Sequence, residues 1–401
     1  LKAALIAAFF LIKFCYKQLM KNIGLVGCGN IAETYFRSQE YFNNIKFVSC
    51  ADINEETAKK CAEKYNINSQ SVDDLMKDDN VDIVLNLTIP AAHYDVIKKT
   101  LNAGKHSYCE KPLSIKFNEG KELLELAEKK NLYIGNAPDT FLGGGGQLSR
   151  KLIDNGSLGE VKLGNFVFAS PGLESWHPNP EPWFYKNVGG PVIDMCPYFF
   201  TMLINLLGPV KSVSAFSTTV HKQREIGSGP KKGNKFKVET PTSYLINIEF
   251  SSGVLIEGLV SFDVINHNRN HMELYGTKGS IIVPDPNMFG GPVKTSFVEG
   301  GRWEEHSTTN MQLGRNNIQN HSGKSNEASE QSNFRGVGLS EMIYAIENKK
   351  NHRCNGQIAL HVLDLIESTM ISAEKNIRIP LQSTCDKPAA FTEQDILKII
   401  K

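Results

Sequence analysis

The feature that most constrains the fold is a regular alternation of short apolar segments with longer amphipathic segments between residues 22 and 138. The short segments have the length and composition of buried strands, whereas the longer ones carry apolar residues at helical spacing. Strands that alternate with such helices form right-handed crossovers, and these build a parallel sheet covered on both faces. We therefore predict an α/β domain with a doubly wound parallel sheet, the Rossmann fold, over residues 20–140.

The pattern changes after residue 150, where strand-like segments follow one another with glycine, proline and serine breaks between them. Only a few helices accompany them, near residue 148, from residue 194, and at 339–347 and 358–373. We predict an α+β domain over residues 141–401 with a largely antiparallel or mixed open sheet. Residues 304–333 hold almost no apolar anchors, and we predict a mobile surface loop there.

The first nineteen residues differ from the rest of the chain. Their apolar stretch of about ten residues is too short to cross a hydrocarbon core of ~30 Å, so we expect no membrane anchor. A signal peptide is the alternative, but no small-x-small cleavage site precedes Met20. We interpret residues 1–19 as an upstream extension outside the fold, with Met20 as the natural start.

Composition excludes several classes of function. The chain has 44 lysines and arginines against 43 aspartates and glutamates, so no basic excess is available to neutralise nucleic-acid phosphates. The eight cysteines show neither a C-x-x-C pair nor a dense disulfide spacing, which favours a reducing compartment, the cytoplasm. The sequence contains no H-E-x-x-H motif and no closely spaced His/Asp cluster, and we therefore predict no metal site.

A dinucleotide fingerprint stands at the first strand-to-helix turn, Gly27-Cys28-Gly29-Asn30-Ile31-Ala32. The first glycine permits the tight turn, and the second lets the backbone approach a diphosphate at the helix N-terminus. The next strand ends at Asp52, where a carboxylate can accept hydrogen bonds from the adenosine ribose. That negative charge disfavours a 2′-phosphate, so we predict NAD rather than NADP, bound by Gly27, Gly29, Asn30, Ile31 and Asp52.

With these motifs the chain resembles the glucose–fructose oxidoreductase/inositol dehydrogenase family, Gfo/Idh/MocA, over nearly its whole length after Met20. The resemblance rests on the fingerprint, Asp52 and four further stretches: TIPAAH at 88–93, Glu110-Lys111-Pro112, GGPVIDMCPY at 189–198 and ELYGTKGSI at 273–281. It implies a nicotinamide-dependent oxidoreductase that acts on a sugar, cyclitol or related polyol held between two domains. Relatives commonly form dimers or tetramers, and the open sheet of the second domain offers a face for such a homo-oligomer.

Lys111 follows a strand at the carboxyl edge of the sheet, where α/β proteins bind their ligands. A lysine there can donate a hydrogen bond to a substrate hydroxyl beside the nicotinamide, and the resemblance implies a catalytic role and a cis bond before Pro112. Pro90 and His93 follow the fourth strand, and we predict that they line the nicotinamide side; Thr88, Glu110 and Lys111 complete the predicted cofactor contacts. For His93 an equally good alternative is that it only stands at the start of a helix, with its ring nitrogens hydrogen-bonded to solvent.

Asp194 and Tyr198 stand four residues apart in an apolar helix, so both side chains point to one side. From the residues alone, Asp194 would only cap the helix and Tyr198 would only pack in the core. The family pattern has a histidine where this chain has Tyr198, and that histidine transfers the proton of the reacting hydroxyl. We therefore predict that Tyr198, assisted by Lys111, transfers the proton and that Asp194 orients a substrate hydroxyl.

His177 is the competing candidate for proton transfer, because imidazole titrates near neutral pH. Three readings of function remain open at this stage. A reversible dehydrogenase is the first, an NAD-dependent glycosidase that uses transient redox chemistry is the second, and a non-catalytic cofactor-binding regulator is the third.

Overall fold

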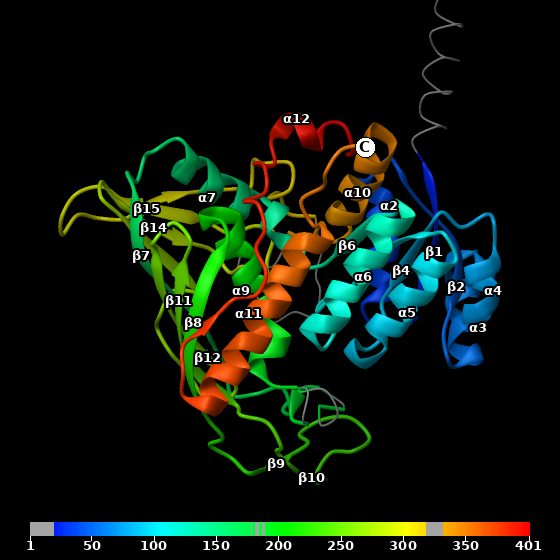
Figure 1. The fold of residues 1–401 in the computed structure, drawn as a ribbon, viewed down its shortest axis with the longest axis horizontal. Coiled ribbons are helices and arrows are strands. Elements are labelled where there is room, and N and C mark those ends of the chain that lie inside the picture. The colour runs from blue at the N-terminus through cyan, green and yellow to red at the C-terminus, as the bar shows by residue number, and fades with distance from the viewer. Residues whose placement is uncertain (1–19, 178, 181–183, 187–188, 318–331) are drawn as a thin grey trace, which may run out of the picture.

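A computed structural model describes residues 20–177, 179–180, 184–186, 189–317 and 332–401. The interpretation of residues 1–19 as an extension therefore concerns residues outside the described part of the chain. Figure 1 shows two sheet-containing parts side by side, with the long helix α11 (Gly356–Lys375) lying between them.

The first part is a six-stranded parallel sheet in the order β3-β2-β1-β4-β5-β6, as predicted for a Rossmann domain. Its strands are β1 (Lys21–Val26), β2 (Ile45–Ala51), β3 (Asn68–Ser69), β4 (Ile83–Asn86), β5 (His106–Cys109) and β6 (Ile134–Asn136). The helices that cover it are α2 (Ala32–Tyr41), α3 (Glu55–Tyr65), α4 (Val72–Lys77), α5 (Pro90–Asn102) and α6 (Phe117–Lys130).

Burial explains why these strands form. All four residues of β4 are buried, as are the last four of β1, because helices cover both faces of the sheet. The helices begin and end at suitable residues: for α3, the Asn54 side chain accepts hydrogen bonds from the amides of Glu56 and Thr57, and Asn66 ends it with φ +52°. The short β3 and α4 were not predicted.

The second part is a nine-stranded mixed sheet in the order β16-β15-β14-β13-β7-β12-β11-β8-β17, as expected for the α+β domain. Every pair is antiparallel except β7 with β12, which is parallel. The strands are β7 (Val161–Ala169), β8 (Val210–Thr218), β11 (Ser243–Phe250), β12 (Leu255–Ser261), β13 (Met272–Gly276), β14 (Ser280–Val283), β15 (Val293–Ser296), β16 (Glu304–His306) and β17 (Ile379–Pro380). The strands β9 (Gln223–Glu225) and β10 (Lys235–Lys237) form a separate hairpin.

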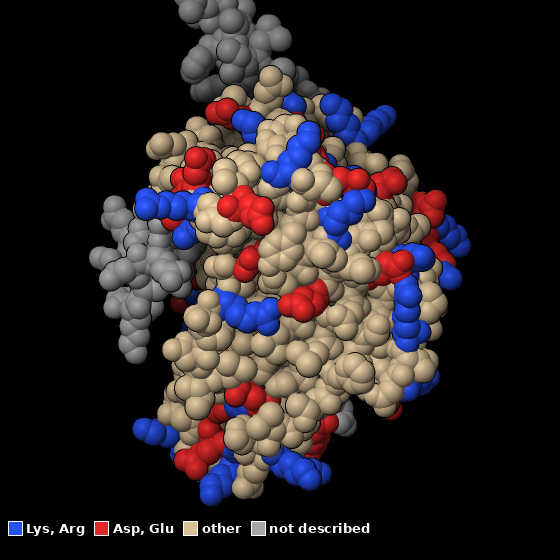
Figure 2. All heavy atoms as spheres, turned by 90° about the vertical axis from the view of Figure 1, so that its left-hand side faces the viewer, with Lys and Arg blue, Asp and Glu red and all other residues tan. Residues whose placement is uncertain are grey.

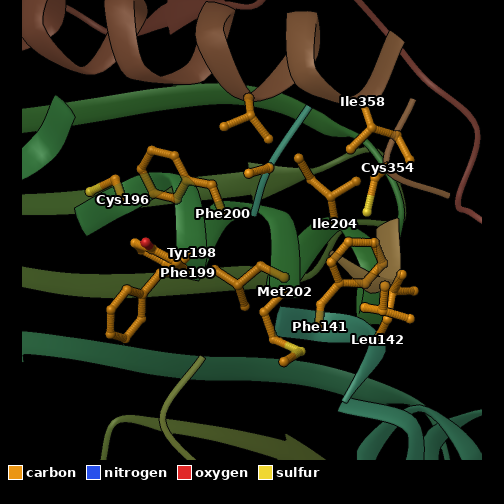
Figure 3. Close-up of a cluster of buried hydrophobic side chains, with 14 of the residues drawn as sticks. Phe141, Leu142, Cys196, Tyr198, Phe199, Phe200, Met202, Ile204, Cys354 and Ile358 are labelled. Carbon is orange, nitrogen blue, oxygen red and sulfur yellow. The ribbon is translucent and has the colours of Figure 1, made fainter. Parts of the chain in front are cut away.

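Helices α9 (Pro191–Leu207) and α11 pack on one face of this sheet. Figure 3 shows Phe199, Phe200 and Ile204 of α9 in the apolar cluster, with Ile358 of α11 nearby. Helix α11 also contacts α6, so it joins the two parts of the molecule. The remaining helices are η1 (Thr140–Leu142), α7 (Gly144–Asp154), α10 (Val337–Asn348) and α12 (Glu393–Ile396).

The structure contradicts part of the predicted loop at 304–333. Residues 304–306 form β16 at the edge of the large sheet, and Leu313 is fully buried, so the prediction was wrong for this stretch. A three-residue edge strand needs little apolar content, which is why the composition of this stretch was misleading. Residues 318–331 lie outside the described residues.

The C-terminal third of the chain returns to the dinucleotide-binding part. The buried carboxylate of Asp139 accepts hydrogen bonds from the amides of Gly336 and Gly338, and Ser340 pairs with Asn44. These contacts fix the start of α10 beside the parallel sheet. Across the described ranges, no helix is both long and apolar enough to cross a membrane.

Candidate active site

A cavity of about 390 Å³ lies between the carboxyl edge of the parallel sheet and the first turns of α9. Its wall includes all four residues predicted to act on a substrate, namely Lys111, Asp194, Tyr198 and His177. It also includes four of the residues predicted to contact the cofactor, namely Ile31, Thr88, Pro90 and Glu110. The structure thus brings together residues that lie more than 150 positions apart in the sequence.

Lys111 and Asp194 form an ion pair across the domain junction. The Lys111 ammonium lies 2.7 Å from Oδ1 of Asp194 and 2.6 Å from its backbone carbonyl oxygen. Burial alone would lower the pKa of Lys111, but the Asp194 carboxylate and the neighbouring Tyr198 raise it above its usual value. Lys111 is therefore a permanent cation at neutral pH, suited to donating hydrogen bonds. The peptide bond from Lys111 to Pro112 is cis, as the resemblance implied.

Tyr198 lies beside this pair and is 7% exposed. The Lys111 ammonium is 5.2 Å from the centre of its ring, within the range of a cation–π contact. Arg335, which precedes the N-cap residue of α10, lines the same cavity. The cavity that contains the phenol of Tyr198 is therefore lined by two cationic side chains, Lys111 and Arg335.

Glu110 holds Lys111 and Arg335 in position. Its carboxylate accepts hydrogen bonds from the Tyr35 hydroxyl at 2.9 Å, from Arg335 at 3.1 Å and from the Lys111 amide at 3.0 Å. Burial raises the pKa of Glu110, but Arg335 and Lys111 outweigh it, so the pKa lies below its usual value. Its carboxylate is engaged by protein groups, so it positions Lys111 and Arg335. Neither Arg335 nor Tyr35 was singled out in the sequence, since no motif surrounds them.

The start of α9 differs from the prediction. The helix begins at Pro191 after Gly190, which has φ +100°, and no side chain caps it. Asp194 is thus in the first turn, where the helix dipole stabilises a carboxylate. Its side chain binds Lys111 and does not cap the helix. Pro197 lies inside the helix and not in its first turn, and it removes one backbone donor there.

His93 is fully buried and does not line the cavity, which differs from both readings made for it. Its ring nitrogens lie 2.6 Å from the Pro112 carbonyl and 2.9 Å from the Thr88 carbonyl. Burial lowers its pKa, so the ring is neutral at pH 7 and donates to only one of the two carbonyls. His93 therefore connects two loops that follow neighbouring strands, and it positions the cavity wall.

His177 lines the opposite wall and packs edge-on against Phe184 and Trp176. Its Nδ1 accepts a hydrogen bond from the amide of Asn179 at 3.2 Å. Burial lowers the pKa of His177, so the ring is neutral at pH 7 with its proton on Nε2. This tautomer offers a donor and no free basic nitrogen, which weakens the case for His177 as a base.

The fingerprint turn has the geometry that a diphosphate needs. Gly27 has φ +99°, and a Cβ there would lie 2.7 Å from the Leu87 backbone, so only glycine fits between β1 and β4. Nothing lies within 4 Å of a Cβ at Gly29, and this residue and Asn30 are exposed. Helix α2 has no side-chain cap, so no capping side chain competes with a phosphate at its N-terminus, although the Ala32 amide donates to the Gly29 carbonyl oxygen at 3.1 Å.

The strand order places the predicted cofactor-binding residues along the carboxyl edge of the parallel sheet. Asp52 follows β2, where its carboxylate accepts hydrogen bonds from the amides of Cys28 at 2.8 Å and Asn54 at 2.9 Å. The fingerprint follows the adjacent β1, and Thr88 and Lys111 follow β4 and β5 on the other side. A ribose at Asp52 and a diphosphate at Gly29 would direct the other end of the molecule into the cavity.

Comparison with known proteins agrees with this arrangement. Residues 21–137 match the model of the oxidoreductase family with an NAD-binding Rossmann fold, and residues 147–282 match the Gfo/Idh/MocA C-terminal domain. An uncharacterized oxidoreductase of Schizosaccharomyces pombe is 33% identical over 160 residues, 39% of this chain. The match spans 41% of the length of that relative.

Two further comparisons extend over more of the chain. Myo-inositol 2-dehydrogenase of Thermotoga maritima is 24% identical over 270 residues, which are 65% of this chain and 74% of the relative. The structure of a levoglucosan dehydrogenase in complex with NADH and levoglucosan superposes with a TM-score of 0.75 at 18% identity, covering 90% of this chain and all of that chain. At this identity the superposition shows the fold.

Proposed function

This chain belongs to the Gfo/Idh/MocA family of NAD-binding oxidoreductases, and on that premise we propose that it transfers a hydride between NAD and a hydroxyl-bearing carbon of a sugar, cyclitol or related polyol. The observation that carries the proposal is the convergence of Lys111, Asp194 and Tyr198 in one cavity at the carboxyl edge of the dinucleotide-binding sheet. Relatives named as inositol and levoglucosan dehydrogenases support the substrate class.

The residues of the fingerprint and Asp52 would hold the cofactor, and Thr88 and Pro90 would face its nicotinamide. When bound, NAD supplies the hydride acceptor for the oxidation of an alcohol. The remaining chemistry belongs to the protein. The Asp194 carboxylate accepts a hydrogen bond from a substrate hydroxyl and fixes its orientation.

Proton transfer at the reacting hydroxyl falls to Tyr198. Lys111 donates a hydrogen bond to that hydroxyl oxygen, which favours loss of its proton. During oxidation the deprotonated Tyr198 oxygen accepts this proton and becomes a neutral phenol, and during reduction the phenol returns it to the substrate oxygen. The apolar side chains of Ile115, Phe184 and Ile193 line the same cavity and would exclude water from the reacting carbon.

The choice of NAD over NADP rests on Asp52. Its carboxylate is half-buried at the end of β2 and is fixed by two backbone amides. A 2′-phosphate on the ribose would bring two negative charges close to this carboxylate. Among the described residues, no salt bridge pairs Asp52 with a cation that could offset the repulsion.

We further propose that the enzyme works in the cytoplasm as a homo-oligomer. The seven cysteines in the described part of the chain carry free thiols, which suits a reducing compartment. The face of the large sheet opposite α9 and α11 exposes Leu163, Phe216, Leu245 and Leu255, each more than half exposed. Figure 2 shows this side of the molecule, where broad uncharged surface lies between charged side chains that are scattered over the middle, the upper part and the edges. Such a face suits a partner copy.

The test of the proposal is an absorbance assay at the nicotinamide wavelength with the purified chain, NAD or NADP, and a panel of sugars, cyclitols and polyols. Net formation of reduced cofactor with at least one substrate supports the dehydrogenase. Release of sugar from a glycoside without net reduction would indicate the glycosidase, and cofactor binding without either reaction would indicate the regulator.

A further inference from the structure

Three cysteine side chains from three different elements converge beneath the dinucleotide-binding turn. Cys28 belongs to the fingerprint itself, Cys50 lies in β2 and Cys61 lies in α3. Their sulfur atoms all lie within 4.8 Å of one another. Across the described ranges this is the only group of three or more His, Cys, Asp or Glu side chains close enough to hold a single ion.

We propose that Cys28, Cys50 and Cys61 form a binding site for a thiophilic metal ion, Zn²⁺ or Cu⁺, that is separate from the substrate cavity. Three sulfur ligands select soft ions, and either a trigonal Cu⁺ or a Zn²⁺ with a water as fourth ligand fits a set of three. Zinc–sulfur bonds of about 2.3 Å would place the sulfurs ~3.8 Å apart, so binding requires only a small contraction of the cluster.

The exposure of the three cysteines and the contacts of their thiols both suit a metal site. Cys28 and Cys61 are half-buried, so an ion can reach them from solvent, whereas Cys50 is fully buried below. Two of the thiols contact backbone carbonyl oxygens, with Cys50 Sγ 3.4 Å from that of Ala58 and Cys28 Sγ 3.7 Å from that of Ala51. These contacts restrict the rotation of the two side chains.

Cysteine binds a metal ion as the thiolate, so a protonated thiol of the cluster must lose its proton when an ion binds. Burial and the neighbouring thiol of Cys28 raise the pKa of Cys61 to about 12. A hydrogen bond with Cys50, followed by burial, raises the pKa of Cys28 well above its usual value. Binding of an ion by three protonated thiols breaks three S–H bonds, forms three metal–sulfur bonds and releases three protons to water, with no change of oxidation state.

The position of the cluster couples it to the cofactor. Cys28 donates its backbone amide to Asp52 at 2.8 Å, and the adjacent Gly29 is the proposed point of contact with the diphosphate. Three thiolates around Zn²⁺ leave one net negative charge beside Asp52 and the diphosphate. We expect the bound ion to weaken NAD binding about threefold to tenfold, and NAD to weaken metal binding by the same factor.

The experiment uses the full, reduced chain, stripped of metal and kept free of oxygen. Zn²⁺ and Cu⁺ are titrated separately against chromophoric chelators, and released protons are measured with a pH indicator. We expect one ion per chain with at least one of the two metals, release of up to three protons, and affinity at least 100-fold weaker in Cys61→Ser. The matched control is Cys385→Ser, which removes a buried thiol from the C-terminal segment and should leave the affinity unchanged.

Substitution of Co²⁺ adds a spectroscopic readout, because thiolate-to-metal charge transfer appears only when sulfur is a ligand. Cys50→Ala should lose this band as Cys61→Ser does, and circular dichroism checks that each variant is folded. Absence of stoichiometric binding by both ions would overturn the proposal. So would unchanged affinity in Cys61→Ser.

Discussion

The ammonium of Lys111 lies 2.7 Å from the carboxylate of Asp194, although the two residues come from different domains. Lys111 follows β5 of the parallel sheet, whereas Asp194 is in the first turn of α9. The pair is largely shielded from solvent, with side-chain exposures of 16% and 19%. It therefore joins the wall of the cavity formed at the edge of the parallel sheet to the wall formed by α9, and each partner holds the other in place.

Replacing Lys111 by Ala should lower kcat by ~10²-fold or more, because the donor to the reacting hydroxyl and the cation beside Tyr198 are both lost. Stability should also fall by about 1–3 kcal/mol, since the partly buried carboxylate of Asp194 would lose its ion-pair partner. Steady-state kinetics and urea unfolding measure the two effects. The matched control is Lys211→Ala, which breaks a lysine–carboxylate pair with Glu249 on the outer face of the large sheet. Wild-type turnover in Lys111→Ala would contradict the assignment.

Tyr198→Phe and His177→Ala distinguish the two candidates for proton transfer. Removing only the phenol oxygen of Tyr198 should lower kcat by about 10²–10⁴-fold with little change in NAD affinity. His177→Ala should act mainly on KM, because its Nδ1 is already bonded to the Asn179 amide and its side chain only lines the wall. Kinetics over pH 6–10 and calorimetry with NAD measure both. The opposite pattern, with kcat lost in His177→Ala alone, would assign the proton to the histidine.

Local sequence patterns were sufficient to predict the parallel sheet and half of the site. Strand and helix periods are local properties, and Gly27, Asp52 and Lys111 stand directly after strands, so their place at the sheet edge follows from the topology. The start of α9 was misplaced because Asp194 was taken as the cap. Pro191 after Gly190 was the better signal, since proline is favoured at the first helical position.

Arg335 and the three-cysteine cluster depend on tertiary structure and could not be predicted. Arg335 lies 225 residues from Glu110, and it reaches the cavity only because Asp139 fixes the start of α10. Cys28, Cys50 and Cys61 have no metal-binding spacing in the sequence, and they meet because β1, β2 and α3 pack together. Spacing rules detect ligands on one element, whereas these ligands come from three.

Asp52→Asn should shift the cofactor preference towards NADP. The amide can still accept one backbone hydrogen bond, but the charge that binds ribose hydroxyls and opposes a 2′-phosphate is gone. We expect the KM for NAD to rise about tenfold or more, and the ratio of kcat/KM for NADP over NAD to rise with it. Kinetics with both cofactors measure this, with the exposed Asp79→Asn as the control. An unchanged ratio would show that Asp52 does not select the cofactor.

Alanine at Gly27 and at Gly29 should give contrasting results. Gly27→Ala forces φ +99° on an alanine and places its Cβ 2.7 Å from the Leu87 backbone, so we expect a loss of ~2 kcal/mol or more in stability. Gly29→Ala meets no atom within 4 Å, and the melting temperature should not change. The new methyl group would nevertheless occupy the approach of the diphosphate and weaken NAD binding about tenfold. Thermal unfolding measures the stability of both variants, and titration calorimetry measures their affinity for NAD. If Gly29→Ala binds NAD as tightly as the wild type, the diphosphate does not bind at this turn.

The stability of the fold should fall as pH is lowered from 6.5 to 4, and His361 should contribute to this. His361 is fully buried in α11, where its Nε2 accepts a hydrogen bond from the Val210 amide at 2.9 Å and its Nδ1 contacts Ser383. Burial lowers the pKa of His361 from 6.5 to about 4. Between these two values the unfolded chain binds a proton that the folded chain does not, so stability is full above pH 6.5 and is lost towards pH 4, by at most about 3 kcal/mol for this residue. Urea unfolding over this range measures how the free energy of unfolding changes with pH. In His361→Gln this slope should be shallower, by up to the equivalent of one bound proton, and in the exposed control His221→Gln it should equal that of the wild type. If His361→Gln keeps the full slope, the acid sensitivity comes from other groups.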